Sequence, residues 1–206
     1  MAAEMEEFMV GLAILHCPWL NSRLQNWFVN NKSKINVVKI GNHSFTTVST
    51  EFNLVFLLLH LYHHVLMEGV GLRQFMDYYF VLKSMEQQDP STKKSFVSII
   101  DSLGMQKFAK GVMWIMHNIF ALEKDKLLMN EDVKVGNLLL KEVLLGGNFG
   151  KYDKRNSLVV SSNPLARVMD GIIRNVRFFS IALAIVLCNP FWRLWHFCWM
   201  KTRGYR

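Results

Sequence analysis

Apolar residues recur at two different spacings along the 206-residue chain. Two short runs rich in β-branched residues, 35–40 and 44–48, flank the turn Gly41-Asn42-His43, and this pattern predicts a β-hairpin. Beyond residue 48 the apolar positions mostly recur every three or four residues, which predicts helices. The chain is therefore predicted to be mainly α, in the α+β class, with a small N-terminal hairpin and about six to eight helices.

Capping residues and prolines indicate where the helices begin and end. Ser49 or Thr50 can cap a long helix that is apolar on nearly every face, and Gly69 is placed to end it in a left-handed conformation. The change of spacing near residue 49 predicts two parts, residues 1–48 and 49–206. Other predicted helices cover residues 19–28, 72–84, 91–103, 108–120, 131–145, 164–179 and 189–201; an apolar run of strand length covers 8–15, and a loop covers 148–163.

Three histidines lie in the second half of the long apolar helix. His60 and His64 are four residues apart and share a helix face, with His63 beside them, and two imidazoles at this spacing can share a metal ion. The sequence shows no complete ligand set, so we predict no metal site. We expect the histidines to make hydrogen bonds near the helix end instead.

Arg73 and Asp77 follow the break at Gly69-Val70-Gly71 and are spaced for a structural ion pair within one helix. Arg73 also lies near the predicted start of that helix, where anions are favoured. It is therefore a candidate contact for a phosphate group. The glycines fit no phosphate-loop or dinucleotide-binding motif.

Charge is distributed unevenly along the chain. Residues 1–150 hold 14 basic and 14 acidic side chains, whereas residues 151–206 hold 10 basic and 2 acidic ones. Trp192, Trp195 and Trp199 lie among these basic residues and could stack on bases, but their spacing equally fits a buried helix stripe, which we favour. The apolar stretch 178–192 is too short to span a membrane, and the three cysteines show no disulfide or metal spacing. These features predict a cytoplasmic protein with reduced thiols.

The residues from Leu59 to His64, with 68–74 and Asp77, carry a family resemblance. The run Leu-His-Leu-Tyr-His-His, followed by Glu-Gly-Val-Gly-Leu-Arg-Gln, resembles the signature of an uncharacterised, Bacteroidetes-type bacterial nucleotidyltransferase family in the polymerase-β-like superfamily. Segments 16–28, 146–153, 191–197 and 204–206 also resemble parts of this family, so the resemblance extends over nearly the whole chain.

The resemblance implies transfer of a nucleoside monophosphate from a triphosphate to an acceptor that the sequence does not identify. Such enzymes bind two metal ions through a Gly-Ser element, an Asp-x-Asp strand and a third carboxylate. This sequence lacks the first two elements, and Ile14 stands where the third acid is expected. We therefore expect residues 1–48 to be a remnant of the catalytic α/β domain and residues 49–206 to form a helical accessory domain, with no catalytic residues of their own.

In a complete enzyme the resemblance implies that Arg73, and with it His60 or His64, contacts the nucleotide or acceptor. Mg²⁺ and a nucleoside triphosphate are expected only in such a complete enzyme. The expected partner of this chain is a separate or upstream catalytic domain. One alternative is a non-catalytic interaction protein that forms homodimers through the strand-like run 8–15. Another is a peripheral membrane protein that uses its basic, Trp-rich tail. We expect no specific nucleic-acid partner, and we favour a chain without membrane contact.

Overall fold

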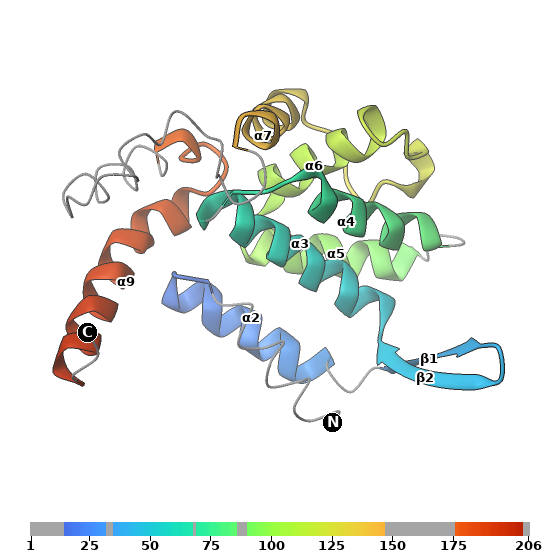
Figure 1. The fold of residues 1–206 in the computed structure, drawn as a ribbon, viewed down its shortest axis with the longest axis horizontal. Coiled ribbons are helices and arrows are strands. Elements are labelled where there is room, and N and C mark those ends of the chain that lie inside the picture. Colours follow the sequence, from blue (N-terminus) through green and yellow to red (C-terminus); the bar gives the residue numbers. More distant parts are fainter. Residues whose placement is uncertain (1–14, 32–34, 68, 86–89, 147–175, 204–206) are drawn as a thin grey trace.

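A computed structural model describes residues 15–31, 35–67, 69–85, 90–146 and 176–203. Within these ranges the chain forms seven α-helices, one short 3₁₀ helix and a two-stranded antiparallel sheet (Figure 1). The predicted mainly α fold with an N-terminal hairpin is confirmed. In chain order the elements are α2 (Pro18–Asn31), β1 (Ile35–Ile40), β2 (His43–Val48), α3 (Thr50–Met67), α4 (Leu72–Ser84), α5 (Pro90–Ser102), α6 (Gln106–Asn118), the 3₁₀ helix η1 (Lys124–Lys126), α7 (Val133–Gly146) and α9 (Leu183–Thr202).

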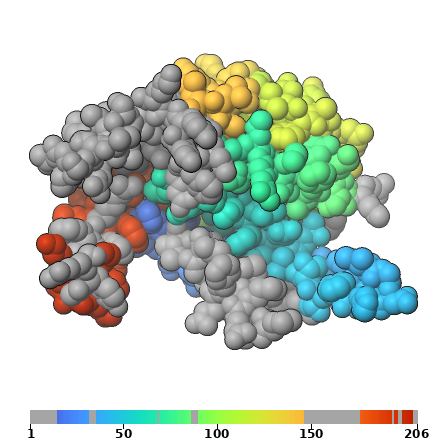
Figure 2. Space-filling view, in the orientation of Figure 1, coloured from blue at the N-terminus to red at the C-terminus, as the bar shows by residue number. Residues whose placement is uncertain are grey.

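The hairpin projects from one end of the helical body (Figures 1 and 2). Its turn has two residues, because His43 begins the second strand and pairs with Ile40. Gly41 adopts a φ of +60°, which only glycine adopts without steric cost. Val38 lies opposite Phe45 in the register, so both side chains share a face with Ile40, and all three are exposed. The hairpin therefore presents an apolar face to its surroundings.

Helix α3 forms the centre of the helical body (Figure 1). The Ser49 hydroxyl accepts a hydrogen bond of 3.2 Å from the backbone N–H of Phe52, so Ser49 caps the helix and Thr50 is its first residue. Nine of its eighteen residues are buried, as expected for a helix that is apolar on most faces. At its end, Gly69 has a φ of +100° and donates its N–H to the carbonyl of His64, which confirms the predicted left-handed cap.

Helix α9 differs from its prediction. Asn189-Pro190 was expected to start this helix, but the helix begins at Leu183 and continues through Pro190. A proline inside a helix removes one backbone hydrogen bond and crowds the carbonyl four residues earlier. Such a helix persists when tertiary contacts stabilise it, and Asn189, at 1% exposure, provides such contacts.

Several predicted elements lie outside the described residues. These are most of the strand-like run 8–15, with Ile14; the loop 148–163; and most of the helix predicted for 164–179. The boundary between residues 48 and 49 stays a prediction. Among the helices of the described ranges, none is both long and apolar enough to cross a membrane.

Candidate functional site

The predicted histidine pair lies side by side on α3. The Nε2 atoms of His60 and His64 are 3.0 Å apart, and the two rings meet edge to face with centroids 4.3 Å apart. One imidazole N–H must therefore donate to the unprotonated nitrogen of the other. In the described part of the chain, no group of three or more His, Cys, Asp or Glu side chains is placed to hold a metal ion. The pair is arranged as a hydrogen-bonded unit.

Arg73 and Asp77 lie on the exposed side of α4, in its first and second turns. No ion pair joins them within the ranges that the structure describes, so the predicted pairing stays a prediction. The Gly71 N–H at the start of this helix donates to the Gln74 side chain at 3.1 Å. The exposed guanidinium of Arg73, rather than this occupied amide, is thus the group available to an anion.

The sequence did not predict that His16 joins three distant segments. Its ring stacks on Trp192 of α9, with centroids 3.9 Å apart and planes 6° apart, and it meets the edge of His63 of α3. Its Nδ1 lies 2.9 Å from the side-chain oxygen of Asn189, whose amide nitrogen donates to the sulfur of Met67 at 3.8 Å. Since 173 residues separate His16 from Asn189, no sequence spacing could indicate their contact.

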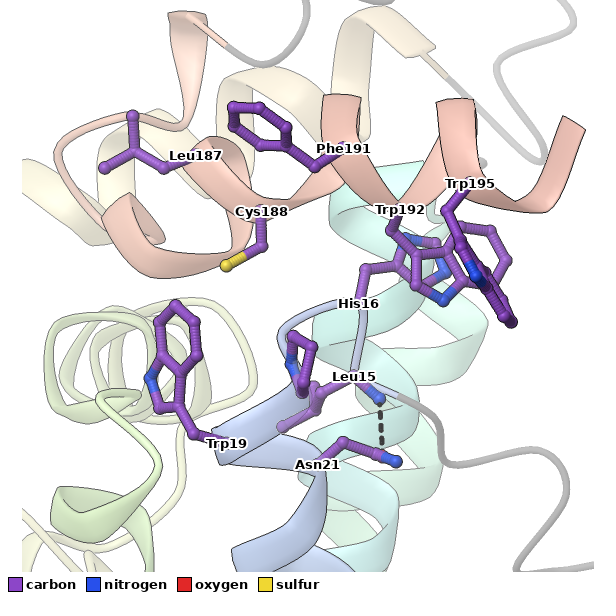
Figure 3. Close-up of a pocket in the computed structure, with 10 residues that line it drawn as sticks. Leu15, His16, Trp19, Asn21, Leu187, Cys188, Phe191, Trp192 and Trp195 are labelled. Atoms are coloured by element: carbon purple, nitrogen blue, oxygen red, sulfur yellow. Dashed lines mark hydrogen bonds between the residues drawn. The ribbon is translucent and has the colours of Figure 1, made fainter. Parts of the chain in front are cut away.

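An apolar pocket of about 730 Å³ lies beside this cluster, between the start of α2 and one side of α9 (Figure 3). Figure 3 shows the Cys188 sulfur directed toward Trp19 across the pocket, with Trp192 and Trp195 at one end. None of the described lining residues is charged. They are Leu15, His16, Pro18, Trp19, Asn21, Leu187, Cys188, Phe191, Trp192 and Trp195.

The pocket corrects the prediction of a buried tryptophan stripe. Trp195 is 59% exposed and Trp199 is 36% exposed, so these indoles do not pack into a core. Trp192 is half-buried and stacks on His16. The spacing of three and four residues correctly indicated that the tryptophans share one side of α9. That side, however, forms a wall of the pocket and continues into an exposed surface.

Cys17 follows His16 in the sequence and is fully buried. Burial, together with a hydrogen bond to the Cys188 side chain, raises the pKa of the Cys17 thiol to about 12. Cys17, Cys188 and Cys198 are all free thiols. Cys17 is thus held as the neutral thiol at physiological pH and is not an activated nucleophile.

A family model described as "Uncharacterised nucleotidyltransferase" matches residues 6–121. This range includes α2 to α6, the histidine pair and Arg73, whereas the α9 wall of the pocket lies beyond it. No curated protein and no solved structure matches the chain. Because the match spans more than half of the 206 residues, the chain belongs to this uncharacterised nucleotidyltransferase family.

Proposed function

We propose that this chain serves nucleotidyl transfer of the polymerase-β-like type as a helical accessory region that contacts the nucleotide or acceptor through Arg73, His60 and His64. The observation that carries the proposal is their placement within the family-matched range. The histidine pair lies on α3 and Arg73 in the first turn of α4, and these two helices pack against each other across a short glycine-containing link. The three side chains therefore come from two helices that are in contact with each other.

The chemistry of these side chains suits a phosphorylated ligand. A guanidinium presents several N–H donors in a fixed plane and binds phosphate oxygens two at a time. The positive end of the α4 dipole adds to its attraction for an anion. Imidazole nitrogens can donate hydrogen bonds to, or accept them from, hydroxyl groups of a nucleotide or acceptor. These groups bind and orient a ligand.

The metal-binding carboxylates would not lie among the described residues, because these ranges contain no acidic cluster that could hold Mg²⁺. Those acids would come from outside the described residues or from a partner catalytic domain. The exposed apolar face of the hairpin supports such a partner. A two-stranded hairpin is marginally stable alone, and an exposed apolar face with Val38, Ile40 and Phe45 is typical of an interaction surface.

Isothermal titration with the four nucleoside triphosphates and Mg²⁺ tests the Arg73 contact. Charge-assisted hydrogen bonds contribute about 1.5–3 kcal/mol, so Arg73→Ala is expected to weaken binding roughly 10- to 100-fold. Lys107→Ala is the matched control, because Lys107 is also an exposed cation at the second residue of a helix, α6. Absence of binding by the unmodified protein, or equal weakening by both substitutions, would contradict the proposal.

A further inference from the structure

We propose that the pocket between α2 and α9 binds the hydrocarbon chain of an anionic amphiphile, whose head group lies at Arg203. The chemical class is a single acyl or isoprenoid chain that ends in a phosphate, sulfate or carboxylate. This inference goes beyond the proposed nucleotidyltransferase role and does not rest on it. The pocket uses residues on both sides of the boundary of the family match at residue 121.

The lining of the pocket selects an apolar guest. A volume of about 730 Å³ lies within the usual range for small-molecule sites, and the described walls are mostly indole, phenyl and aliphatic groups. The polar side chains of the walls are already engaged. Asn21 accepts a hydrogen bond from the backbone N–H of Leu15, and His16 is bonded to Asn189. A phosphate placed inside the pocket would lose its hydration with no described cation to replace it.

The exposure of the walls indicates that the pocket is open to an incoming ligand. Trp19 is 57% exposed and Phe191 is 76% exposed, although both are large apolar side chains that line the pocket. Leaving such groups in water is unfavourable, and a hydrocarbon chain in the pocket would cover them. The free energy gained on binding would then grow with each methylene group that enters.

A path of aromatic rings leads from the pocket to a cation on the same helix. The Trp195 ring, in the pocket wall, lies 6.4 Å from the Trp199 ring, and the Arg203 guanidinium lies 4.7 Å above Trp199. These residues are four apart, so Arg203 lies about 12 Å along the helix from Trp195. An amphiphile with its chain in the pocket would thus place its head group near Arg203.

The charge near Arg203 favours an anionic head group over a neutral one. The sequence of α9 contains no Asp or Glu, and Lys201 lies in its last turn. The partial negative charge of a helix C-terminus is about half a unit, which the full positive charge of Arg203 outweighs. The site therefore combines an apolar pocket with a cationic rim at one end.

Two series of monomeric amphiphiles separate the two parts of the proposal. Dodecyl, tridecyl and tetradecyl sulfates carry an anionic head on a chain long enough to reach the pocket from Arg203, and maltosides of the same chains carry a neutral head. Each compound is titrated below its micelle-forming concentration. Affinity is expected to rise about fourfold per methylene in both series, the value for burying a methylene group. At equal chain length the sulfates are expected to bind more tightly than the maltosides.

Matched variants assign each contribution to its residue. Trp19→Ala is expected to weaken both series, whereas Phe80→Ala, which removes a similarly exposed aromatic of α4 outside the pocket, leaves both unchanged. Phe191→Ala provides a second pocket variant should Trp19→Ala disturb folding. Arg203→Gln is expected to remove the preference for sulfates while keeping the dependence on chain length. Lys83→Gln is its control, because Lys83 also lies over an aromatic ring, that of Tyr79.

Three results would overturn the proposal. The first is affinity that does not depend on chain length, and the second is equal weakening by Trp19→Ala and Phe80→Ala. The third is binding to phosphatidylglycerol vesicles without binding of any monomeric amphiphile, which would make this a membrane-docking surface. If the sulfates bind no more tightly than the maltosides, the Arg203 head-group site is excluded.

Discussion

Gly136→Ala tests how closely helices α6 and α7 pack. A methyl group at Gly136 would lie less than 3.0 Å from three atoms of the Trp114 indole across the interface. Atoms of folded proteins almost never approach so closely, so either the helices must separate or the indole must turn. Gly111 makes a similar close approach from α6, where an added methyl would meet Val135. The two glycines thus allow the helix backbones to lie unusually near each other.

Two opposing effects decide the magnitude. Inserting a methyl group into a filled interface costs about 1–3 kcal/mol, whereas alanine is favoured over glycine inside a helix by about 1 kcal/mol. The indole is flat and rigid and is packed against the core, so it cannot yield as a flexible chain would. The difference between the two effects is about 0–2 kcal/mol. Because the added methyl would lie under 3.0 Å from three indole atoms, we expect the upper half of this range, a free energy of unfolding lowered by about 1–2 kcal/mol.

Urea denaturation followed by circular dichroism measures this change. In a Trp114→Leu background the indole is absent, so the same Gly136→Ala substitution should raise the free energy of unfolding by about 1 kcal/mol, the helix-propensity gain alone. The reversal of sign identifies the clash with Trp114 as the cause. If Gly136→Ala is as stable as the original protein while Trp114 is present, the close-packing argument fails.

Three further predictions concern buried and exposed polar groups. A thiol reagent at pH 8, followed by mass spectrometry, should label the exposed Cys198 in the folded protein. The buried Cys17, whose pKa is about 12, should react only after denaturation. Labelling of Cys17 before denaturation would contradict this prediction. Burial also raises the pKa values of Tyr62 and Tyr78, so above about pH 9–10 unfolded chains lose protons that folded chains retain. Urea titrations should therefore show a free energy of unfolding that falls as the pH rises above this range, and a free energy that stays level or rises there would contradict the argument. Tyr78→Phe should raise thermal stability by about 1 kcal/mol, because the buried hydroxyl has no hydrogen-bond partner among the described residues; a loss of stability would indicate a partner.

Local sequence patterns predicted most helices of the described ranges and the hairpin. Helix α4 begins and ends at the predicted residues, and α5 and α6 end within about two residues of prediction, because apolar spacing, capping residues and glycines act over a few neighbouring positions. The pairing of His60 with His64 was predictable for the same reason, since four residues make slightly more than one helix turn. The placement of Arg73 in the first turn of α4 also followed from local signals.

Contacts between distant segments were decided only by the tertiary structure. The sequence signals a helix start at Asn189-Pro190, yet α9 continues through Pro190 because Asn189 is buried against His16 and Met67. Spacing places Trp195 and Trp199 on one helix side, but burial depends on what packs there, and here that side borders a pocket. The sequence by itself thus determined the helices and the positions of Arg73, His60 and His64 on them, because these depend on interactions between near neighbours. Tertiary packing alone decided the contact between His16 and α9, because these residues are far apart in the sequence and no interaction between near neighbours links them.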